Sequence, residues 1–242
     1  MNMKAEQEGF PHKQLPIFIN ETKKLLAYLK SLSDDELKTV WGTSEKLAQL
    51  NIERIRRMDL EKNLSPAILA FQGLQYQYLG GQVLSEKELD YLQNHLYIVS
   101  GFYGLLRPLD GVVPYRLEMK SSFNDWEHAS LVDFWAERLG EQINSETNLV
   151  LNLASKEYSQ TILPHLDEQT QVIDFVFGEW IDGKVKQKAT LLKMARGEMV
   201  RYLATNEIDD LEEVKKFEGQ GFVFSEKESD PQTFVYIKEA SN

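Results

Sequence analysis

The chain has 242 residues, of which 42% are hydrophobic and 27% charged, and its formal net charge is −11. This is the composition of a globular protein that can bury a sizeable core, and the absence of cysteine excludes disulfides, thiolate metal ligands and cysteine nucleophiles. The negative charge argues mildly against a general nucleic-acid coat and is compatible with a local basic cleft.

The sequence predicts a cytoplasmic protein. It contains no apolar run of the roughly 18 residues that a membrane span needs, so we expect no contact with membranes. Residues 1–10 are polar and lack the apolar stretch of a signal peptide. The lack of cysteine fits a reducing compartment.

The first third of the chain is predicted to be helical. Leucine and tyrosine recur at helical spacing over residues 25–32. Residues 33–36 and 85–88 have the sequence of a capping box, which marks the start of a helix. Residues 42–44 interrupt the helical pattern, and a further helix is predicted over residues 47–58.

Strands are predicted mainly in the second half. Apolar, β-branched and aromatic runs predict strands at 67–71, 97–99, 149–153, 172–177, 222–224 and 234–237. Asp182-Gly183 predicts a hairpin turn, and further helices are expected at 131–143 and 194–206. The sequence contains no repeat or linker, so we predict a single compact domain over residues 1–242, of mixed α/β class, with a mixed sheet flanked by helices.

Residues 100–119 form the most informative segment. Three glycines and two prolines restrict its backbone, and Pro108 disfavours helix at Arg107. Arg107 and Arg116 extend from this frame, and a guanidinium suits phosphate or carboxylate. Glu118 shares a strand face with Arg116 if the segment is extended. The segment is therefore either an anion site or a turn braced by an Arg–Glu network, which is a common structural use of such residues.

A second basic group follows later in the chain. Lys184, Lys186 and Lys188 alternate along one predicted strand, a pattern that also protects edge strands from aggregation. Lys193 and Arg196 lie on neighbouring helical turns. If the helix begins at Met194, its free N–H groups add to an anion site there.

Residues 37–48 contain two predicted helices joined by a short turn with Gly42. This pattern is typical of a helix-hairpin-helix, whose backbone N–H groups point at a DNA phosphate. Ser44 stands where such an element usually has a second glycine, and any helical hairpin has a similar pattern.

Other catalytic and metal-binding patterns are missing. The histidines, at 12, 95, 128 and 165, lack metal-ligand spacing, and we identify no phosphate-binding loop, nucleophile elbow or dinucleotide fingerprint. We therefore assign no catalytic residue, metal ligand or cofactor. Residues 152–158 leave a predicted strand and enter a predicted helix, with Ser155 as a functional group or simply the N-cap.

The sequence resembles the YaaA-like peroxide stress-response family over nearly its whole length. Six segments match the landmarks of that family in order: residues 44–48, 100–110, 114–119, 152–158, 193–197 and 217–222. The long motif at residues 107–119 makes the resemblance specific.

The resemblance implies a helix-hairpin-helix-like element near the N-terminus, a basic cleft that binds duplex DNA, and a role in limiting iron-dependent oxidative damage. Family members usually have no assigned catalytic activity. The cleft residues implied are Arg107, Arg116, Lys156, Lys193, Arg196 and Arg201, and the hairpin residues are Gly42, Thr43, Ser44 and Lys46.

The N-terminus and the basic residues each lead to one further expectation. The family normally opens with an apolar strand followed by a lysine-containing turn, and residues 1–6 do not match it, so we expect the first strand to be missing. The alternative function is an enzyme or small-anion-binding protein, in which Arg107, Arg116 and Lys193 hold a phosphorylated or carboxylate ligand and Glu118 or Tyr158 serves as acid or base. The sequence leaves the oligomeric state open.

Overall fold

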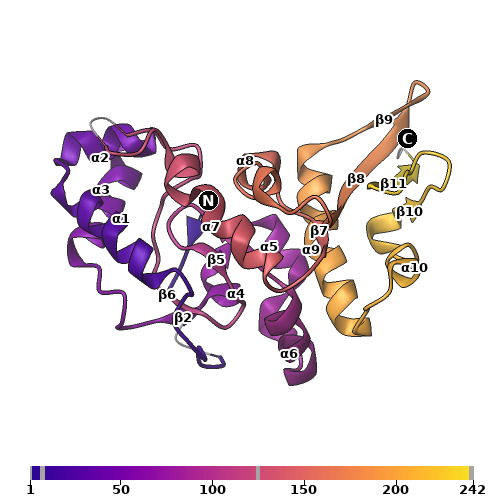
Figure 1. Ribbon diagram of the computed structural model, residues 1–242, viewed down its shortest axis with the longest axis horizontal. Helices are drawn as coiled ribbons and strands as arrows, with labels where there is room; N and C mark the ends of the chain where they lie inside the picture. The colour runs from indigo at the N-terminus through magenta and orange to yellow at the C-terminus, as the bar shows by residue number, and fades with distance from the viewer. Residues whose placement is uncertain (1, 6–8, 124–125, 240–242) are drawn as a thin grey trace. The chain divides into compact units, whose positions relative to one another are not determined.

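The structure is a computed structural model that describes residues 2–5, 9–123 and 126–239. The chain forms two compact units, which are described separately (Figure 1). The first unit comprises Met1–Gln72, Gln93–Ser145 and Ala154–Leu166, and the second comprises Gly73–Leu92, Glu146–Leu153 and Asp167–Asn242. That residues 1–242 form a single domain stays a prediction. Among the described residues, no helix has both the length and the hydropathy to cross a membrane.

The first unit is mainly helical, and its strands are short. Its helices are α1 (Ile19–Ser31), α2 (Asp34–Trp41), α3 (Glu45–Arg57), α4 (Ala67–Ala70), α7 (Leu131–Asn144), α8 (Lys156–Ser159) and the 3-10 helix η2 (Leu163–His165). Three antiparallel strand pairs are β1 (Asn2–Met3) with β3 (Phe71–Gln72), β2 (Ser65–Pro66) with β6 (Gly111–Val112), and β4 (Ile98–Ser100) with β5 (Gly104–Leu106).

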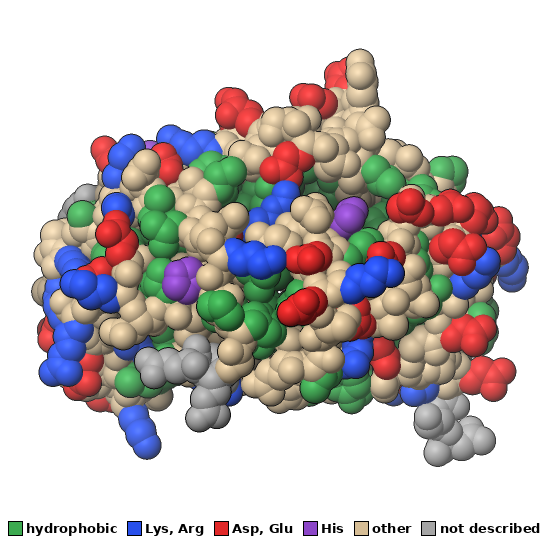
Figure 2. Space-filling view, turned by 90° about the horizontal axis from the view of Figure 1, so that it is seen from below, with side chains coloured by type: hydrophobic (Ala, Val, Ile, Leu, Met, Phe, Trp, Pro, Cys, Tyr) green, Lys and Arg blue, Asp and Glu red, His purple; other side chains and the backbone are tan. Residues whose placement is uncertain are grey.

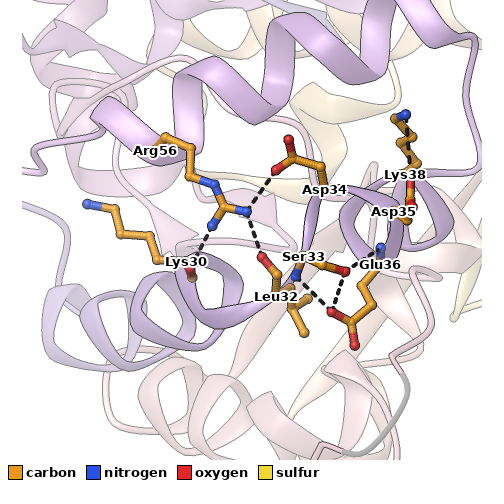
Figure 3. Close-up of polar contacts among 8 residues, drawn as sticks. All are labelled: Lys30, Leu32, Ser33, Asp34, Asp35, Glu36, Lys38 and Arg56. Atoms are coloured by element: carbon orange, nitrogen blue, oxygen red, sulfur yellow. Dashed lines mark hydrogen bonds and ion pairs between the residues drawn. The ribbon is translucent and has the colours of Figure 1, made fainter.

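Local polar contacts explain where the first helices begin and end (Figure 3). The predicted capping box is confirmed at the start of α2: the Glu36 N–H donates to Ser33 Oγ, and the Ser33 N–H donates to the Glu36 carboxylate. The Arg56 guanidinium of α3 donates to the carbonyl oxygens of Lys30 and Leu32, both at 2.6 Å, and so satisfies orphan acceptors at the end of α1. Arg56 also pairs with Asp34, which ties the first three helices together.

The strand predicted at 67–71 is wrong over most of its length, because Ala67–Ala70 is a helical turn and only Phe71 begins a strand. All five residues are buried. A short run that is apolar on every side has no periodicity, so the sequence pattern cannot separate a buried helix from a buried strand.

The second unit contains a five-stranded sheet, in which the strand order is β10-β11-β8-β7 and β9 also pairs with β8. Its strands are β7 (Leu149–Asn152), β8 (Gln171–Ile181), β9 (Lys184–Lys186), β10 (Val223–Phe224) and β11 (Thr233–Glu239). β8 pairs in parallel with β7 and β11, and in antiparallel with β9. The predicted strands at 149–153, 172–177, 222–224 and 234–237 are confirmed within one or two residues at most ends, as is the mixed sheet.

Helices pack against this sheet and complete a mixed α/β fold (Figure 1). They are α9 (Ala189–Asn206), α10 (Leu211–Val214) and the 3-10 helix η3 (Gly219–Gly221). The second unit also contains α5 (Leu74–Leu79), which packs against α9, the 3-10 helix η1 (Gly81–Val83), and α6 (Glu86–His95), whose last three residues belong to the first unit. The core between α9 and the sheet is largely aromatic, with Phe177, Phe217 and Tyr236 at its centre.

Two turn predictions in the second unit have different outcomes. The Asp182-Gly183 hairpin is confirmed, and both residues have positive φ, as a two-residue hairpin turn requires. The helix predicted to begin at Met194 instead begins at Ala189. The prediction was wrong because nothing in the sequence marks the true start: the N-cap residue, Lys188, makes no side-chain capping bond.

We predict that Ser33→Ala lowers the free energy of unfolding by about 1 kcal/mol, because it removes the side-chain acceptor of the α2 capping box. The matched control is Ser44→Ala, since Ser44 is the N-cap of α3 but its side chain makes no capping bond. Urea denaturation of the three proteins measures both effects. Equal losses in the two variants would contradict the assignment.

Candidate anion-binding site

A buried polar network holds residues 100–119 in place. Ser100 Oγ accepts hydrogen bonds from the N–H groups of Phe102 and Tyr103 and lies 2.5 Å from the hydroxyl oxygen of Tyr115. The Tyr103 hydroxyl accepts from the Val113 N–H at 3.1 Å. The turn after β4 and the chain after β6 are therefore joined by side-chain hydrogen bonds within the core.

Close packing requires glycine at position 101, one of the three glycines of the 100–119 segment. A Cβ at this position would lie 2.8 Å from the carbonyl oxygen of Leu117, so only glycine lets the turn pack against the strand-like stretch that carries Arg116 and Glu118. The carbonyl oxygen of Gly101 also accepts from the Trp135 indole N–H at 3.0 Å.

Asp110 fixes the turn that follows Arg107. Its carboxylate is 1% exposed and accepts from the Arg107 N–H at 2.8 Å and from the Gln14 side-chain amide at 2.8 Å. Burial raises the pKa of Asp110 to about 6, although these two hydrogen bonds and the charge of Arg107 act in the opposite direction. No sequence pattern identifies this role of Asp110, because one of its partners, Gln14, is distant in the chain.

Arg107 is held by its own unit. Its guanidinium carbon lies 3.7 Å from the centroid of the Tyr97 ring, and one guanidinium nitrogen donates to the Asn94 carbonyl oxygen at 3.2 Å. These contacts orient the side chain. They also show that Arg107 has a structural role whether or not it binds a ligand.

Arg116 lies in a polar cluster that also contains Glu118 and Tyr158. Arg116 and Glu118 form the predicted ion pair, at 2.9 Å, with side chains that are 20% and 22% exposed. The pKa of Glu118 is lowered, because nearby positive charges that include Arg116 and Lys120 outweigh the burial that raises it. Burial, and then the charges of Glu157 and Glu118, raise the pKa of Tyr158 well above its usual range, so Tyr158 stays protonated.

Helix α8 brings the later motif to the same cluster. The Lys120 N–H donates to the Glu157 carboxylate at 3.3 Å, and Lys156, the preceding residue, is exposed. Ser155 occupies the N-cap position of α8, as predicted, but its side chain makes no capping bond. The first unit therefore brings three predicted segments together.

Three predicted cations belong to the second unit, on α9. Lys193 is exposed, and it lies inside the helix instead of at its N-terminus, so the predicted contribution of free N–H groups is wrong. Arg196 lies near Asp174, which in turn accepts from the Asn152 side-chain amide at 2.7 Å. Burial lowers the pKa of Arg196, and Asp174 partly offsets this effect.

Two further residues of α9 serve packing. A Cβ at Gly197 would collide with the Gln75 carbonyl oxygen, so this glycine permits the close approach of α5 and α9. Arg201 lies against Gly80, and its charge contributes to the low pKa of Glu88, about 2, which is due mainly to hydrogen bonds from Thr205 and Ser85. These contacts give Arg201 a structural role.

The α2–α3 hairpin has the geometry of a helix–turn–helix pair. Gly42 ends α2 in the left-handed conformation, with φ 51° and ψ 44°, and its N–H donates to the Lys38 carbonyl oxygen at 2.9 Å. Ser44 and Lys46 are exposed, and Thr43 is half-buried. Lys38 pairs with Glu45 at 2.8 Å across the turn.

The strand lysines take part in local ion pairs. Lys186 pairs with Asp182 at 2.8 Å, and Lys188 pairs with the buried Glu179. β9 pairs only with β8 among the described strands, so its lysines follow the pattern of a protected edge strand.

The six predicted cleft cations divide between the two units, with Arg107, Arg116 and Lys156 in the first and Lys193, Arg196 and Arg201 in the second. A cleft that unites them stays a prediction. On the face drawn in Figure 2, basic and acidic side chains are interspersed. Across the described ranges, no group of three or more histidine, aspartate or glutamate side chains is placed to hold a metal ion.

Comparison with known proteins identifies relatives over nearly the whole chain. The family described as "Peroxide stress protein YaaA" matches residues 1–228. A UPF0246 protein of Lachnoclostridium phytofermentans is 47% identical over 235 residues, which cover 97% of this chain and 92% of the relative. UPF0246 proteins of Lactiplantibacillus plantarum and Limosilactobacillus reuteri are 45% and 47% identical over 97% of this chain, and 95% and 94% of their own lengths are covered.

We predict that Asp110 makes folding more favourable at acidic pH. Because its pKa is about 6 in the folded protein and near 4 in an unfolded chain, the folded state binds the proton more tightly. This contribution is fully present below about pH 4 and is lost as the pH rises through about 6. Between these limits, the stability of the wild type relative to Asp110→Asn should fall by about 1–3 kcal/mol.

Urea denaturation across this pH range measures the effect. Asp182→Asn is the matched control, since Asp182 is an exposed turn residue with positive φ, which asparagine tolerates. Parallel pH profiles for the wild type and Asp110→Asn would show that the Asp110 carboxyl titrates normally.

Proposed function

This chain belongs to the YaaA family of peroxide stress proteins, and we propose that it acts in the cytoplasm in the response to hydroperoxides, where it binds duplex DNA and limits iron-dependent damage. The proposed contacts go to DNA phosphates and carry little sequence specificity. Basic side chains of both units supply them: Arg116, Lys156 and Lys46 from the first, and Lys193 and Arg196 from the second.

The α2–α3 hairpin is the observation that carries the proposal. The left-handed Gly42 turns the chain sharply between two helices, and the Ser44 side chain makes no capping bond. The Leu47 N–H donates to the Ser44 carbonyl oxygen, which leaves the N–H groups of Glu45 and Lys46 without a capping acceptor among the described residues. Such N–H groups suit a phosphate oxygen, and the exposed Lys46 follows in the first turn. These features support the proposal that the hairpin contacts a DNA backbone as a helix-hairpin-helix does.

The acidic character of the whole protein means that DNA binding must come from short-range contacts with the phosphate backbone, because long-range attraction is absent. With a net charge of −11, the overall field repels DNA, so affinity depends on local cations that displace counterions from phosphates. Binding of this kind falls steeply as salt concentration rises.

A second candidate function is binding of a small phosphorylated or carboxylate ligand at the Arg116–Glu118–Tyr158 cluster. The observation that favours it is the partial burial of an arginine and a glutamate beside a protonated tyrosine hydroxyl. A partly desolvated guanidinium binds a small anion more strongly than an exposed one does, and Tyr158 is a ready hydrogen-bond donor.

We predict that the protein binds duplexes of unrelated sequence with similar affinity, and that this affinity falls as salt rises. The double variant Lys46→Ala, Lys193→Ala should weaken binding to all sequences and reduce the slope of log K against log salt by about 2, one unit for each phosphate contact. Fluorescence anisotropy at several salt concentrations measures both quantities.

The matched control is Lys62→Ala, Lys227→Ala, in which one exposed lysine is removed from each unit at positions outside the proposed contacts. The control should keep the slope of the wild type. An affinity that is absent at low salt, or that changes with neither salt nor the first double variant, would refute DNA binding.

The second candidate predicts that one class among nucleotides, sugar phosphates and dicarboxylates raises the melting temperature. Arg116→Gln should abolish this rise, because the ligand loses its charged donor, whereas Lys193→Ala should not change it. No shift with any of these classes would count against a small-anion site.

A further inference from the structure

An aromatic pocket in the first unit is lined by none of the proposed DNA-contacting residues. It encloses about 270 Å³ between α1 and the segment that leads into α7, and it is lined by Tyr28, Trp126, His128, Phe134, Lys24 and Arg138, among others. This volume lies just below the range of pockets for drug-sized ligands, about 300–1,000 Å³, so it suits a ligand of one or two rings.

The aromatic rings at this pocket form a cluster around Trp126, which also includes Phe123 with its centroid 4.6 Å from that of Trp126. Tyr28 and Trp126 are stacked with centroids 5.3 Å apart and an interplanar angle of 20°, and Phe134 lies 5.3 Å from Trp126 at 34°. His128 meets Trp126 edge-on at 4.9 Å, and its Nδ1 lies 3.4 Å from the Asp133 carboxylate. The nearly parallel faces of Tyr28 and Trp126 favour a flat ligand that stacks on this cluster.

The charged side chains around the rings further restrict the class of ligand that the pocket can bind. Lys24 and Arg138 line the pocket together with Glu21 and Glu127. The two cations disfavour a quaternary ammonium ligand, which aromatic cages with carboxylates bind, and the two carboxylates disfavour a purely anionic ligand. A neutral heterocycle with both hydrogen-bond donors and acceptors on its edge fits all four groups.

We propose that this pocket binds a nucleobase. Stacking on Trp126 supplies the affinity, as aromatic side chains do in proteins that bind unpaired bases. Glu21 and Glu127 accept hydrogen bonds from exocyclic amino groups, and Lys24 and Arg138 donate to ring or carbonyl acceptors or to an attached phosphate.

The base has two sources that share this chemistry: a free nucleoside or nucleotide, and an unpaired base in a nucleic acid. Neither requires the phosphate contacts proposed above, because the pocket residues and the proposed DNA contacts are different side chains. The inference therefore goes beyond duplex binding and can hold or fail separately from it.

Fluorine NMR of protein labelled with 5-fluorotryptophan tests the proposal. The chain has four tryptophans, so the spectrum is simple, and the Trp126 signal is assigned by its loss in Trp126→Phe. We expect adenosine to shift the Trp126 signal saturably, with little change at Trp41, Trp135 and Trp180. Ribose 5-phosphate should leave the Trp126 signal unchanged, because it lacks the base.

Two variants and two duplexes complete the experiment. Trp126→Ala should weaken adenosine binding about tenfold or more, as loss of a stacking partner does, and Trp180→Ala, which removes an exposed tryptophan of the second unit, should not. A duplex with one bulged adenine that shifts the Trp126 signal more strongly than the fully paired duplex identifies nucleic acid as the source of the base. A shift with adenosine but with neither duplex identifies the free nucleoside.

The proposal is overturned if the Trp126 signal of the wild type does not shift saturably with adenosine, guanosine or the bulged duplex, since this measurement needs no variant to fold. It is also overturned if choline shifts the signal and the nucleosides do not. Binding of the fully paired duplex without any shift at Trp126 would leave the proposed DNA binding intact and refute the pocket alone.

Discussion

The buried hydroxyl of Ser100 is the constraint on which the first unit depends. It accepts hydrogen bonds from the N–H groups of Phe102 and Tyr103 and is hydrogen-bonded to the Tyr115 hydroxyl. One side chain therefore joins the end of β4, the turn after it and the chain beyond β6. The rings of Phe102, Tyr103 and Tyr115 pack around it. A buried polar network is stable only when every member is satisfied, and this one fixes a single path for the backbone.

The side chains that could meet a ligand extend from this rigid path. Arg107 precedes the Asp110 turn and Arg116 follows Tyr115, so the position of each guanidinium is set by buried neighbours. Each guanidinium also has a partner within the first unit: Arg107 lies over the Tyr97 ring, and Arg116 pairs with Glu118. A structural role for these arginines is therefore compatible with ligand binding, because an arginine side chain that is already oriented loses little conformational entropy when it binds.

The sequence predicted what local chemistry determines. Capping boxes, the Asp182-Gly183 turn and the long strand β8 were predictable because each is specified by residues close in the chain. The Ala67–Ala70 helix was not, since its tertiary burial removes any periodicity, and the start of α9 was not, since no side-chain capping bond marks it. The Arg116–Glu118 pair follows from strand spacing. Its electrostatic effect on Tyr158 and the packing of Tyr28 on Trp126 join segments that are distant in sequence.

The central claim is that the α2–α3 hairpin meets the DNA backbone, and hydrogen exchange measured by mass spectrometry tests it most directly. The free protein and its mixture with a duplex of arbitrary sequence are compared at low salt. We predict slower exchange over residues 42–48 in the presence of DNA, reversed by added salt, with no change in the β8–β9 hairpin. Unchanged exchange over residues 42–48 while DNA is bound would contradict it.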